Sequence, residues 1–392
     1  MTTARLPVNL TDAQIEEFGR ELDAIRAEVI DSRGDRDRQY ILRVIKTQRS
    51  LALGGRILIF ASTLFLPAWG HALASAASFW VLIAVGTLSL ALAKILENME
   101  IAHNVLHAQW DWMKDDNIQS NTWEWDHVCP SDQWMRSHNV RHHTWTNVLG
   151  KDPDVGYGLL RVSSAQRWKP FYLGQPLYAL LLALLFEWGI AIQELELGRV
   201  FAGKMSLEQI RPMLRRTGKK MAAQAMKDYA LWPLLAVILT LPFTLAGAGP
   251  PLLGVFLWVF AANAVASLLR NLWTYLIIFC GHFPADVYVF TKQQVENETR
   301  ASWYVRQLLA SCNIRGGKLF DVLSGNLSHQ IEHHLFPDLP SNRYPDLALR
   351  VRALADRYDL PYNTGSLTRQ FGTTVWKILR LTFPGGSTLG AA

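Results

Sequence analysis

Four long apolar runs constrain this fold more than any other feature of the sequence. A helix needs about 20 apolar residues to cross a bilayer, and the runs at 51–69, 72–96, 229–245 and 252–280 approach or exceed that length. The links within each pair, 70–71 and 246–251, are short and carry no formal charge. The sequence therefore predicts an all-α integral membrane protein with four transmembrane helices arranged as two hairpins.

Basic residues predict which way these hairpins face. Segments before the first run and after the fourth are rich in Arg and Lys, as in Arg36, Arg38, Arg43, Lys46 and Arg49. Since cytoplasmic loops carry an excess of such residues, we expect both termini and the long middle segment in the cytoplasm, with a bacterial inner membrane as the location. The short apolar run 177–192 is expected in or near the membrane interface, because a crossing there would separate histidines that belong together.

The composition excludes several other classes of protein. Of the 392 residues, 50% are hydrophobic and 18% charged, which excludes a disordered chain. The net charge of +6 suits an anionic membrane surface or a phosphate-bearing substrate. No basic run is interleaved with aromatics, so nucleic-acid binding is not expected. Three cysteines without a CxxC pair predict neither disulfides nor a thiolate metal site.

The two ends of the chain are predicted to be cytosolic helical segments, 1–50 and 351–392. The acidic N-terminus has no early apolar run, so no signal peptide is expected. Thr11 and Gln14 fit a helix capping box. An amphipathic stripe then follows at helical spacing, formed by Ile15, Phe18, Leu22, Ile25 and Val29. We expect this stripe to pack on the cytosolic body, with lipid head groups as the alternative contact.

Histidine is the informative residue type for function. Eight of the 11 histidines fall in three short strings, far more than an even scatter would place there. The strings are His103-Asn-Val-Leu-His107, His138-Asn-Val-Arg-His142-His143 and His329-Gln-Ile-Glu-His333-His334. On a helix, residues four apart share a face, and the residue that follows such a pair points about 100° away from the second member. Each HxxxHH string can therefore serve two adjacent metal ions.

Topology is expected to bring these strings together with a ninth histidine. His103 and His107 end the second crossing, and His282 ends the fourth. All nine imidazoles then lie at one membrane face, which gives four or five ligands to each of two metals. Imidazole suits Fe, Zn, Cu and Ni, so ligand type alone does not name the metal. His71, in an outer turn, and His127 are not predicted to be ligands.

With these residues in hand, the chain resembles the membrane fatty acid desaturases, in particular their bacterial acyl-lipid and acyl-CoA branch, over residues 50 to 350. The resemblance rests on the first string, on the second with its continuation Thr144-Trp-Thr-Asn147 and Gly150-Lys-Asp152-Pro-Asp154, and on Gly325-Asn326-Leu-Ser-His329-Gln330-Ile-Glu332-His333-His334-Leu-Phe-Pro337. Three ordered histidine boxes separated by hydrophobic pairs are highly specific for this superfamily.

The resemblance implies two Fe ions held by the box histidines, with His282 as an extra ligand. It implies removal of two hydrogens from adjacent methylenes of a fatty acyl-CoA or acyl-lipid, giving a cis double bond with O₂ as co-substrate. Relatives also use an Asn that binds iron through water, for which Asn326 is the candidate. Gln330 to His334 match the Gln-Ile-Glu-His-His of front-end members, although His329 precedes them. No cytochrome b5 domain with His-Pro-Gly-Gly is seen, which implies an external donor, a ferredoxin or a cytochrome b5-like protein with its reductase.

Residues beside the boxes have expected supporting roles. Asp152, Asp154 and Glu332 are predicted to orient imidazoles through their distal N–H groups, with a solvated loop position as the alternative. Three tryptophans are predicted to wall a substrate tunnel, with interfacial anchoring as the alternative: Trp110, Trp112 and Trp145. Cytosolic Arg and Lys are expected to bind the phosphates of CoA or of a phospholipid head group.

Other functions remain as alternatives. A hydroxylase or related oxygenase uses similar histidine strings, although the Thr-Asn and Asp-Pro-Asp continuation resembles desaturases. A metal transporter would place ionisable ligands near the bilayer midplane, whereas these histidines are predicted at helix ends. A haem protein with paired axial histidines would not need His-His doublets.

Overall fold

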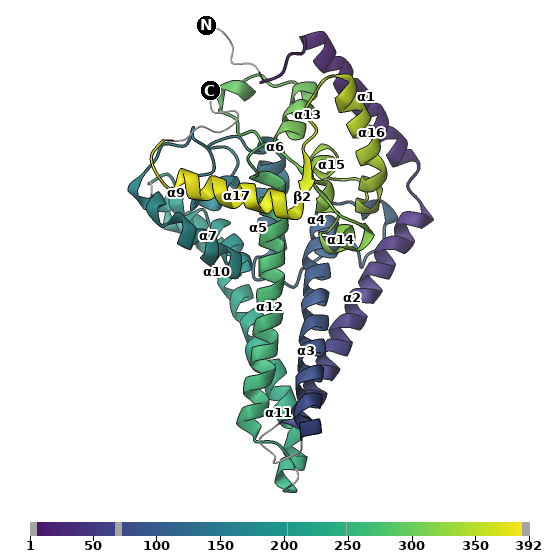
Figure 1. Ribbon diagram of the computed structural model, residues 1–392, viewed down its shortest axis with the longest axis vertical. Coiled ribbons are helices and arrows are strands. Elements are labelled where there is room, and N and C mark those ends of the chain that lie inside the picture. The colour runs from purple at the N-terminus through teal and green to yellow at the C-terminus, as the bar shows by residue number, and fades with distance from the viewer. Residues whose placement is uncertain (1–5, 67–72, 202, 248, 386–392) are drawn as a thin grey trace.

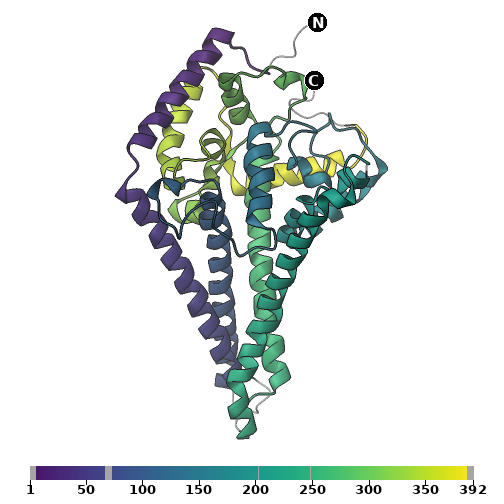
Figure 2. The same ribbon diagram turned by 180° about the vertical axis from the view of Figure 1, so that it is seen from behind.

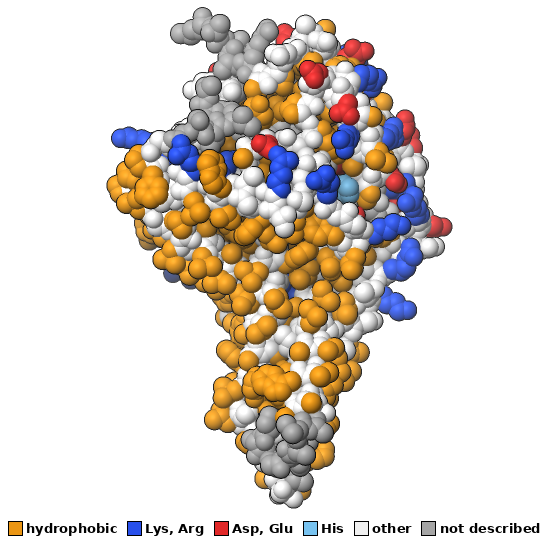
Figure 3. Space-filling model, viewed as in Figure 1, with side chains coloured by type: hydrophobic (Ala, Val, Ile, Leu, Met, Phe, Trp, Pro, Cys, Tyr) orange, Lys and Arg blue, Asp and Glu red, His pale blue; other side chains and the backbone are white. Residues whose placement is uncertain are grey.

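A narrow helical stem widens into a larger cap in the computed structural model, which describes residues 6–66, 73–201, 203–247 and 249–385 (Figure 1). The stem consists of α2 (Asp35–Ser62), α3 (Leu73–Leu96), α11 (Trp232–Leu245) and α12 (Leu252–His282). α2 packs along α3, and both α3 and α11 pack on α12. Apolar side chains cover the stem, whereas charged side chains gather on the cap (Figure 3).

Among the described residues, three helical stretches are long and apolar enough to cross a membrane: Ala76–Leu106, Leu207–Leu245 and Leu252–His282. They contain most or all of the predicted runs 72–96, 229–245 and 252–280. The first stretch continues α3 through η3 (Glu97–Ala102) and α4 (His103–Leu106), and the second joins α10 (Leu207–Met226) to α11 through η8 (Lys227–Leu231). Each helix is thus longer than its apolar run and reaches into the cap.

The predicted first crossing, 51–69, lies in the second half of α2 and in η1 (Thr63–Phe65), and 67–69 fall outside the described residues. α2 is not among the three stretches above, because its first half carries many charged side chains. Its packing along α3 is what a hairpin requires, but this crossing stays a prediction.

The predicted interfacial run, 177–192, forms two helices rather than one. η7 (Pro170–Gly174) leads into α7 (Gln175–Leu184), and α8 (Phe186–Gln193) follows after a bend of 104°. Both helices pack against α12. A bent pair of this kind has the length for a broken span or a re-entrant loop, so the interfacial placement stays a prediction.

Buried ion pairs tie the stem helices together just below the cap. Lys94 Nζ lies 2.7 Å from an oxygen of Asp228, and Arg270 pairs with Glu187. Asp126, on the loop between the first two histidine strings, accepts from Lys227. Because a buried charge without a partner is costly, these pairs fix the loop and α8 against the stem.

The cap contains most of the remaining short elements. α1 (Asp12–Asp31) packs against α13 (Arg300–Leu309), and its Phe18, Leu22 and Val29 are buried in a core shared with α16 (Tyr344–Arg357). The Thr11–Gln14 capping box is present. The predicted stripe therefore packs on the protein body rather than on lipid.

Short elements make up the rest of the cap. They are η4 (Asp111–Met113), α5 (Ser131–Met135), η5 (Arg136–His142), α6 (His143–Trp145), η6 (Val155–Gly158), α9 (Leu197–Phe201), η9 (Gln293–Val295), α14 (Lys318–Leu323), η10 (Leu327–His329), α15 (Gln330–Leu335) and η11 (Ser341–Arg343).

One small sheet corrects the expectation of an all-α chain. β1 (Asn313–Arg315) pairs in parallel with β2 (Thr364–Ser366), with Ile314 opposite Gly365. The strands are three residues long, too short for a two-residue alternation to stand out in the sequence. α17 (Leu367–Leu381) then runs across α12 (Figure 1), so the predicted C-terminal segment is helical over much of its described length.

Candidate metal centre

Two π-helical turns position the first two histidine strings. η3 directly precedes His103, and η5 carries His138 and His142, with His143 at the start of α6. A π turn closes its hydrogen bond from residue i to i+5 and so contains one more residue than an α turn. The residues after it are therefore rotated relative to an ideal α-helix, which changes the direction of each imidazole.

The first cluster of imidazoles joins all three strings. His103, His107, His138 and His333 are buried, and each offers a nitrogen within 4.8 Å of the others. The ring of His333, from α15, lies 4.8 Å from that of His103 and 4.7 Å from that of His107, centroid to centroid. Four nitrogens at this spacing can surround one metal ion.

The second cluster lies directly beside the first. His142, His143 and His334 offer nitrogens within 4.8 Å of one another. His282, at the end of α12, places its Nε2 3.3 Å from His334 Nε2. The rings of His107 and His143 are 4.6 Å apart and connect the two clusters. Eight of the nine predicted ligands therefore meet in two adjacent groups.

The clusters divide the second string differently from an ideal helix. On an ideal helix, His138 and His142 share a face and His143 points away from that face. In the structure His138 belongs to the first cluster and His142 and His143 to the second, while His138 and His142 also form a third group with Asp154 and have their rings stacked 4.9 Å apart. The π-helical turn over Arg136–His142 is the physical reason. The third string divides as predicted, with His333 in one cluster and His334 in the other.

Unpartnered ring nitrogens show that these clusters fit metal ions. Several buried imidazole nitrogens lack a hydrogen-bond partner among the described residues: His107 Nε2, His138 Nε2, His142 Nε2, both nitrogens of His143, His282 Nδ1 and His333 Nε2. A buried polar atom without a partner is costly and rare. So many in one place form a site that could hold metal ions.

Two carboxylates contact imidazoles of the second string at their Nδ1 atoms. His142 Nδ1 lies 3.0 Å from both carboxylate oxygens of Asp152, and His138 Nδ1 lies 3.4 Å from Asp154. Asp152 also accepts the backbone N–H groups of Asn147 and Asp154, each at 2.8 Å. Both predicted carboxylates therefore contact imidazoles, in the position where they fix a ring and raise its basicity as a ligand.

Further imidazoles have neutral partners that the sequence analysis missed. His334 Nδ1 lies 3.1 Å from Gln307 Oε1, and His333 Nδ1 lies 3.4 Å from the Tyr344 hydroxyl. Gln307 comes from α13, 27 residues before His334, and Tyr344 begins α16, 11 residues after His333. Only the fold brings them to the centre, so no local signal marks them.

Burial and mutual repulsion keep most of these imidazoles neutral. Burial, followed by repulsion from neighbouring imidazoles, holds the pKa values of His107, His143 and His333 well below the usual 6.5. His142 differs, because Asp152 and Asp154 raise its pKa although burial alone lowers it. Neutral imidazole is the form that binds metals.

The structure does not bring His329 into either cluster. Its Nε2 lies 3.9 Å from Asp321, and the side chain is 19% exposed. In η10, before the start of α15, it does not share the face of His333. Asn326 donates to Tyr40 and Glu100, and Glu332 accepts from Asn313 and Tyr362. Asn326 and Glu332 thus support the protein around the third string rather than the imidazoles themselves.

Two further histidines, His71 and His127, were not predicted to be metal ligands. His71 lies outside the described residues. His127 is buried, stacks on Trp125 at 4.2 Å, and accepts the backbone N–H of Cys129 at 3.0 Å. It belongs to neither cluster, although it lines the same pocket as His103 and His138.

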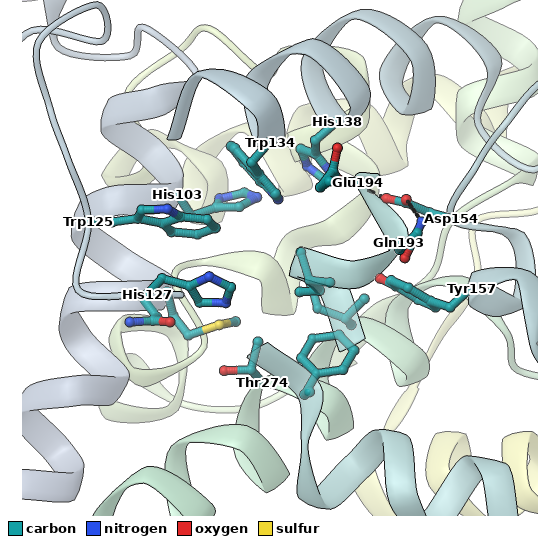
Figure 4. Close-up of a pocket in the computed structure, with 15 residues that line it drawn as sticks. His103, Trp125, His127, Trp134, His138, Asp154, Tyr157, Gln193, Glu194 and Thr274 are labelled. Atoms are coloured by element: carbon teal, nitrogen blue, oxygen red, sulfur yellow. Dashed lines mark hydrogen bonds and ion pairs between the residues drawn. The ribbon is translucent and has the colours of Figure 1, made fainter. Parts of the chain in front are cut away.

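A pocket opens beside the first cluster (Figure 4). His103 and His138 form one wall, and Trp125, Trp134 and Tyr157 form much of the rest. Trp134 stacks on His138 at 4.2 Å. The lining also includes Phe186, Ile190, Gln193, Glu194, Thr274 and Ile278. Apolar and aromatic side chains therefore extend up to the imidazoles of the first cluster.

The tryptophans predicted to wall a tunnel lie elsewhere. Trp110 is fully buried beside Tyr40, Trp112 lies near Arg33, and Trp145 lies under Lys151. Nearness in sequence to a box does not give the direction of a side chain. Trp134 had a usable signal, since it precedes His138 by four residues and so shares its helical face.

Comparisons with known proteins agree with this site. Residues 78–366 match the family model described as fatty acid desaturase. The chain is 45% identical over 376 residues to an NADPH-dependent stearoyl-CoA 9-desaturase of Mycobacterium tuberculosis, covering 96% of this chain and 82% of that protein. An acyl-lipid 8-desaturase of Rebecca salina is 35% identical over 114 residues, 28% of this chain and 26% of its own.

A bovine relative, fatty acid desaturase 3 of Bos taurus, is 32% identical over 113 residues, which is 29% of this chain and 23% of its own. The family model spans all three histidine strings and the helices that carry them. The chain is a membrane enzyme that belongs to the fatty acid desaturase family.

Proposed function

We propose that this enzyme introduces a cis double bond at position 9 of a long-chain fatty acyl-CoA, using O₂ and an external electron donor. The observation that carries the proposal is the pair of adjacent imidazole clusters, the first of which lines a largely apolar pocket through His103 and His138. The 45% identity to a stearoyl-CoA 9-desaturase over nearly the whole chain supports the substrate and the bond position.

The proposed cofactor is a pair of iron ions. His103, His107, His138 and His333 would hold one, and His142, His143, His334 and His282 the other. Bound there, the iron pair supplies the oxidising power toward an unactivated C–H bond that side chains lack. Asp152 and Asp154 hold their imidazoles in fixed orientations. His329 is left without a direct role at the metals.

Electron balance requires the donor. Removing two hydrogens from the acyl chain releases two electrons, whereas reducing O₂ to two waters consumes four. Two more must come from outside, and we propose a ferredoxin or a cytochrome b5-like protein with its reductase. The mycobacterial relative is named as NADPH-dependent, and we propose NADPH as the source of the electrons that this donor would carry.

The pocket beside the first cluster is the proposed site of the acyl chain. Trp125, Trp134 and Phe186 would exclude water from the reacting methylenes. The cavity itself is narrow, about 50 Å³. Ligand pockets usually measure roughly 300–1,000 Å³, so an incoming chain would have to displace some of the lining side chains.

The head group is proposed to lie just outside this pocket. Gln193 and Glu194 line both the pocket and a depression on its other side, which also contains Arg136 and Arg141. These two guanidinium groups would face the phosphates of CoA. We further propose that the cap and both termini face the cytoplasm, where acyl-CoA and the electron donor are found, and that the stem lies in the inner membrane.

The test is fatty acid analysis of a bacterial host that expresses this chain together with an NADPH-dependent electron donor system. The expected product is a 9-unsaturated acid, located by derivatisation and gas chromatography–mass spectrometry. It should disappear in the His333→Ala variant. Hydroxylated acids would instead favour an oxygenase, and a double bond at another position would refute the proposed position.

A further inference from the structure

Helix α10 leaves the stem obliquely and runs along the edge of the cap (Figures 1 and 2). It is continuous through η8 with α11, and Leu207–Leu245 together form one of the three stretches able to cross a membrane. Its final residues therefore lie where the chain enters the bilayer. Its first residues lie at the rim of the cap.

One face of α10 is held against the protein. Arg216 donates to both carboxylate oxygens of Asp132, at 2.6 and 2.8 Å. The Thr217 hydroxyl donates to Gln133 at 2.9 Å, and Lys220 pairs with Glu124. Thr217 and Ile210 are buried. These contacts fix which face of the helix points away from the body.

The outward face carries an unpaired basic row. Leu207, Arg211, Arg215 and Lys219 follow at intervals of four and so lie within about 120° of one another on the helix. The three basic side chains are exposed, and none forms an ion pair with a residue that the structure describes. The acidic residue of this helix, Glu208, stands at the end farther from the stem.

Apolar side chains share this outward face. Leu207 is 67% exposed, Leu214 46% and Met226 55%. Met226 comes seven residues after Lys219 and so lies close to the basic row. Basic and apolar side chains on one exposed face are typical of a helix that lies against a membrane surface.

We propose that Arg211, Arg215 and Lys219 bind the phosphate head groups of anionic phospholipids at the surface of the bilayer. The row lies at the cap end of the stretch Leu207–Leu245, next to its apolar part in α11, where basic side chains are attracted to anionic lipid. An acidic protein would meet the same charges. The exposed Leu207, Leu214 and Met226, together with the continuity with α11, favour the bilayer.

The test measures lipid binding to the purified, detergent-solubilised full chain, without reference to its activity. Phosphatidylglycerol should raise the Tm, and phosphatidylcholine should not. In Arg211→Gln/Arg215→Gln/Lys219→Gln, binding of phosphatidylglycerol should weaken roughly 100-fold. A control of equal charge change, Arg20→Gln/Lys292→Gln/Arg352→Gln, removes exposed basic residues elsewhere on the cap and should bind as the wild type does.

A second measurement needs no variant. Raising the salt concentration to about 1 M, where the screening length is about 3 Å, should abolish most of the phosphatidylglycerol effect on the wild type. An unchanged effect of phosphatidylglycerol in the α10 variant would overturn the proposal. Equal effects of the two lipids would do so too. A variant that keeps its lipid binding but no longer binds an acidic electron donor would assign the row to a protein partner instead.

Discussion

The carboxylate of Asp152 lies 3.0 Å from His142 Nδ1 through both of its oxygens, at the back of the second imidazole cluster. The opposite nitrogen, His142 Nε2, is buried without a partner. The His142 ring thus contacts the Asp152 carboxylate through Nδ1, while its Nε2 is available to bind a metal ion. If His142 binds the proposed metal, this arrangement fixes the orientation of its ring in advance.

Replacing Asp152 should therefore weaken metal binding without removing a ligand. In Asp152→Asn we expect roughly 10- to 100-fold lower metal affinity, because the imidazole loses its charged partner. Metal retained after dialysis against graded chelator measures this. Asp132→Asn, on the surface of the cap, is the control. If Asp152→Asn retained as much metal as the wild type, the contact between Asp152 and His142 would not affect metal affinity.

The two clusters predict a stepwise loss of metal. His333→Ala removes a nitrogen from the first cluster only, so bound metal should fall from about two ions to about one per chain. His329→Ala should retain both, because His329 lies beside Asp321 and outside the clusters. Elemental analysis of the purified variants gives the counts. Loss of metal from His329→Ala would restore His329 as a ligand.

The position of Thr274 predicts control over acyl chain length. Its side chain lines the pocket, and its hydroxyl is buried without a partner. Thr274→Phe should fill this part of the pocket and lower the kcat/KM for an 18-carbon substrate relative to a 14-carbon one by roughly 10-fold or more. Leu272→Phe, on the same helix but lining a separate groove, is the matched control. An equal loss of kcat/KM for both substrates would show that Thr274 does not lie near the end of the acyl chain.

Glu194 predicts a pH-dependent stability. Burial raises the pKa of its carboxyl from 4.5 to about 8. The unfolded chain ionises this group above about pH 4.5, whereas the folded chain holds it neutral up to about pH 8. Wild-type stability should therefore fall as the pH rises through this window, by an amount on the order of a few kcal/mol.

Glu194→Gln removes this titration, so its Tm relative to the wild type should increase between pH 5 and pH 8. Thermal unfolding of the metal-free protein at several pH values measures the difference, with the exposed Glu208→Gln as the control. A difference that stays constant with pH would show that the carboxyl is ionised in the folded chain.

Local patterns in the sequence were sufficient for the main elements and for most ligands. The apolar runs predict the long stem helices, because a helix that crosses a bilayer needs a length and a hydropathy that can be read from its own segment alone. The spacing of the boxes identifies eight histidines that meet in the structure, because neighbours on a helix stay neighbours after folding. Asp152 and Asp154 lie in the loop that follows the second string, so their nearness in sequence and their chemistry suggested them rather than helical geometry.

Only the tertiary structure decided how these groups are divided and what surrounds them. The π turn at Arg136–His142 assigns His142 and His143 to the same cluster, although ideal helical geometry separates them. Gln307 and Tyr344 reach the imidazoles from other helices, and Trp125 rather than Trp110 lines the pocket. Sequence spacing determines which side chains share a helical face. The packing of one helix against another determines what that face meets.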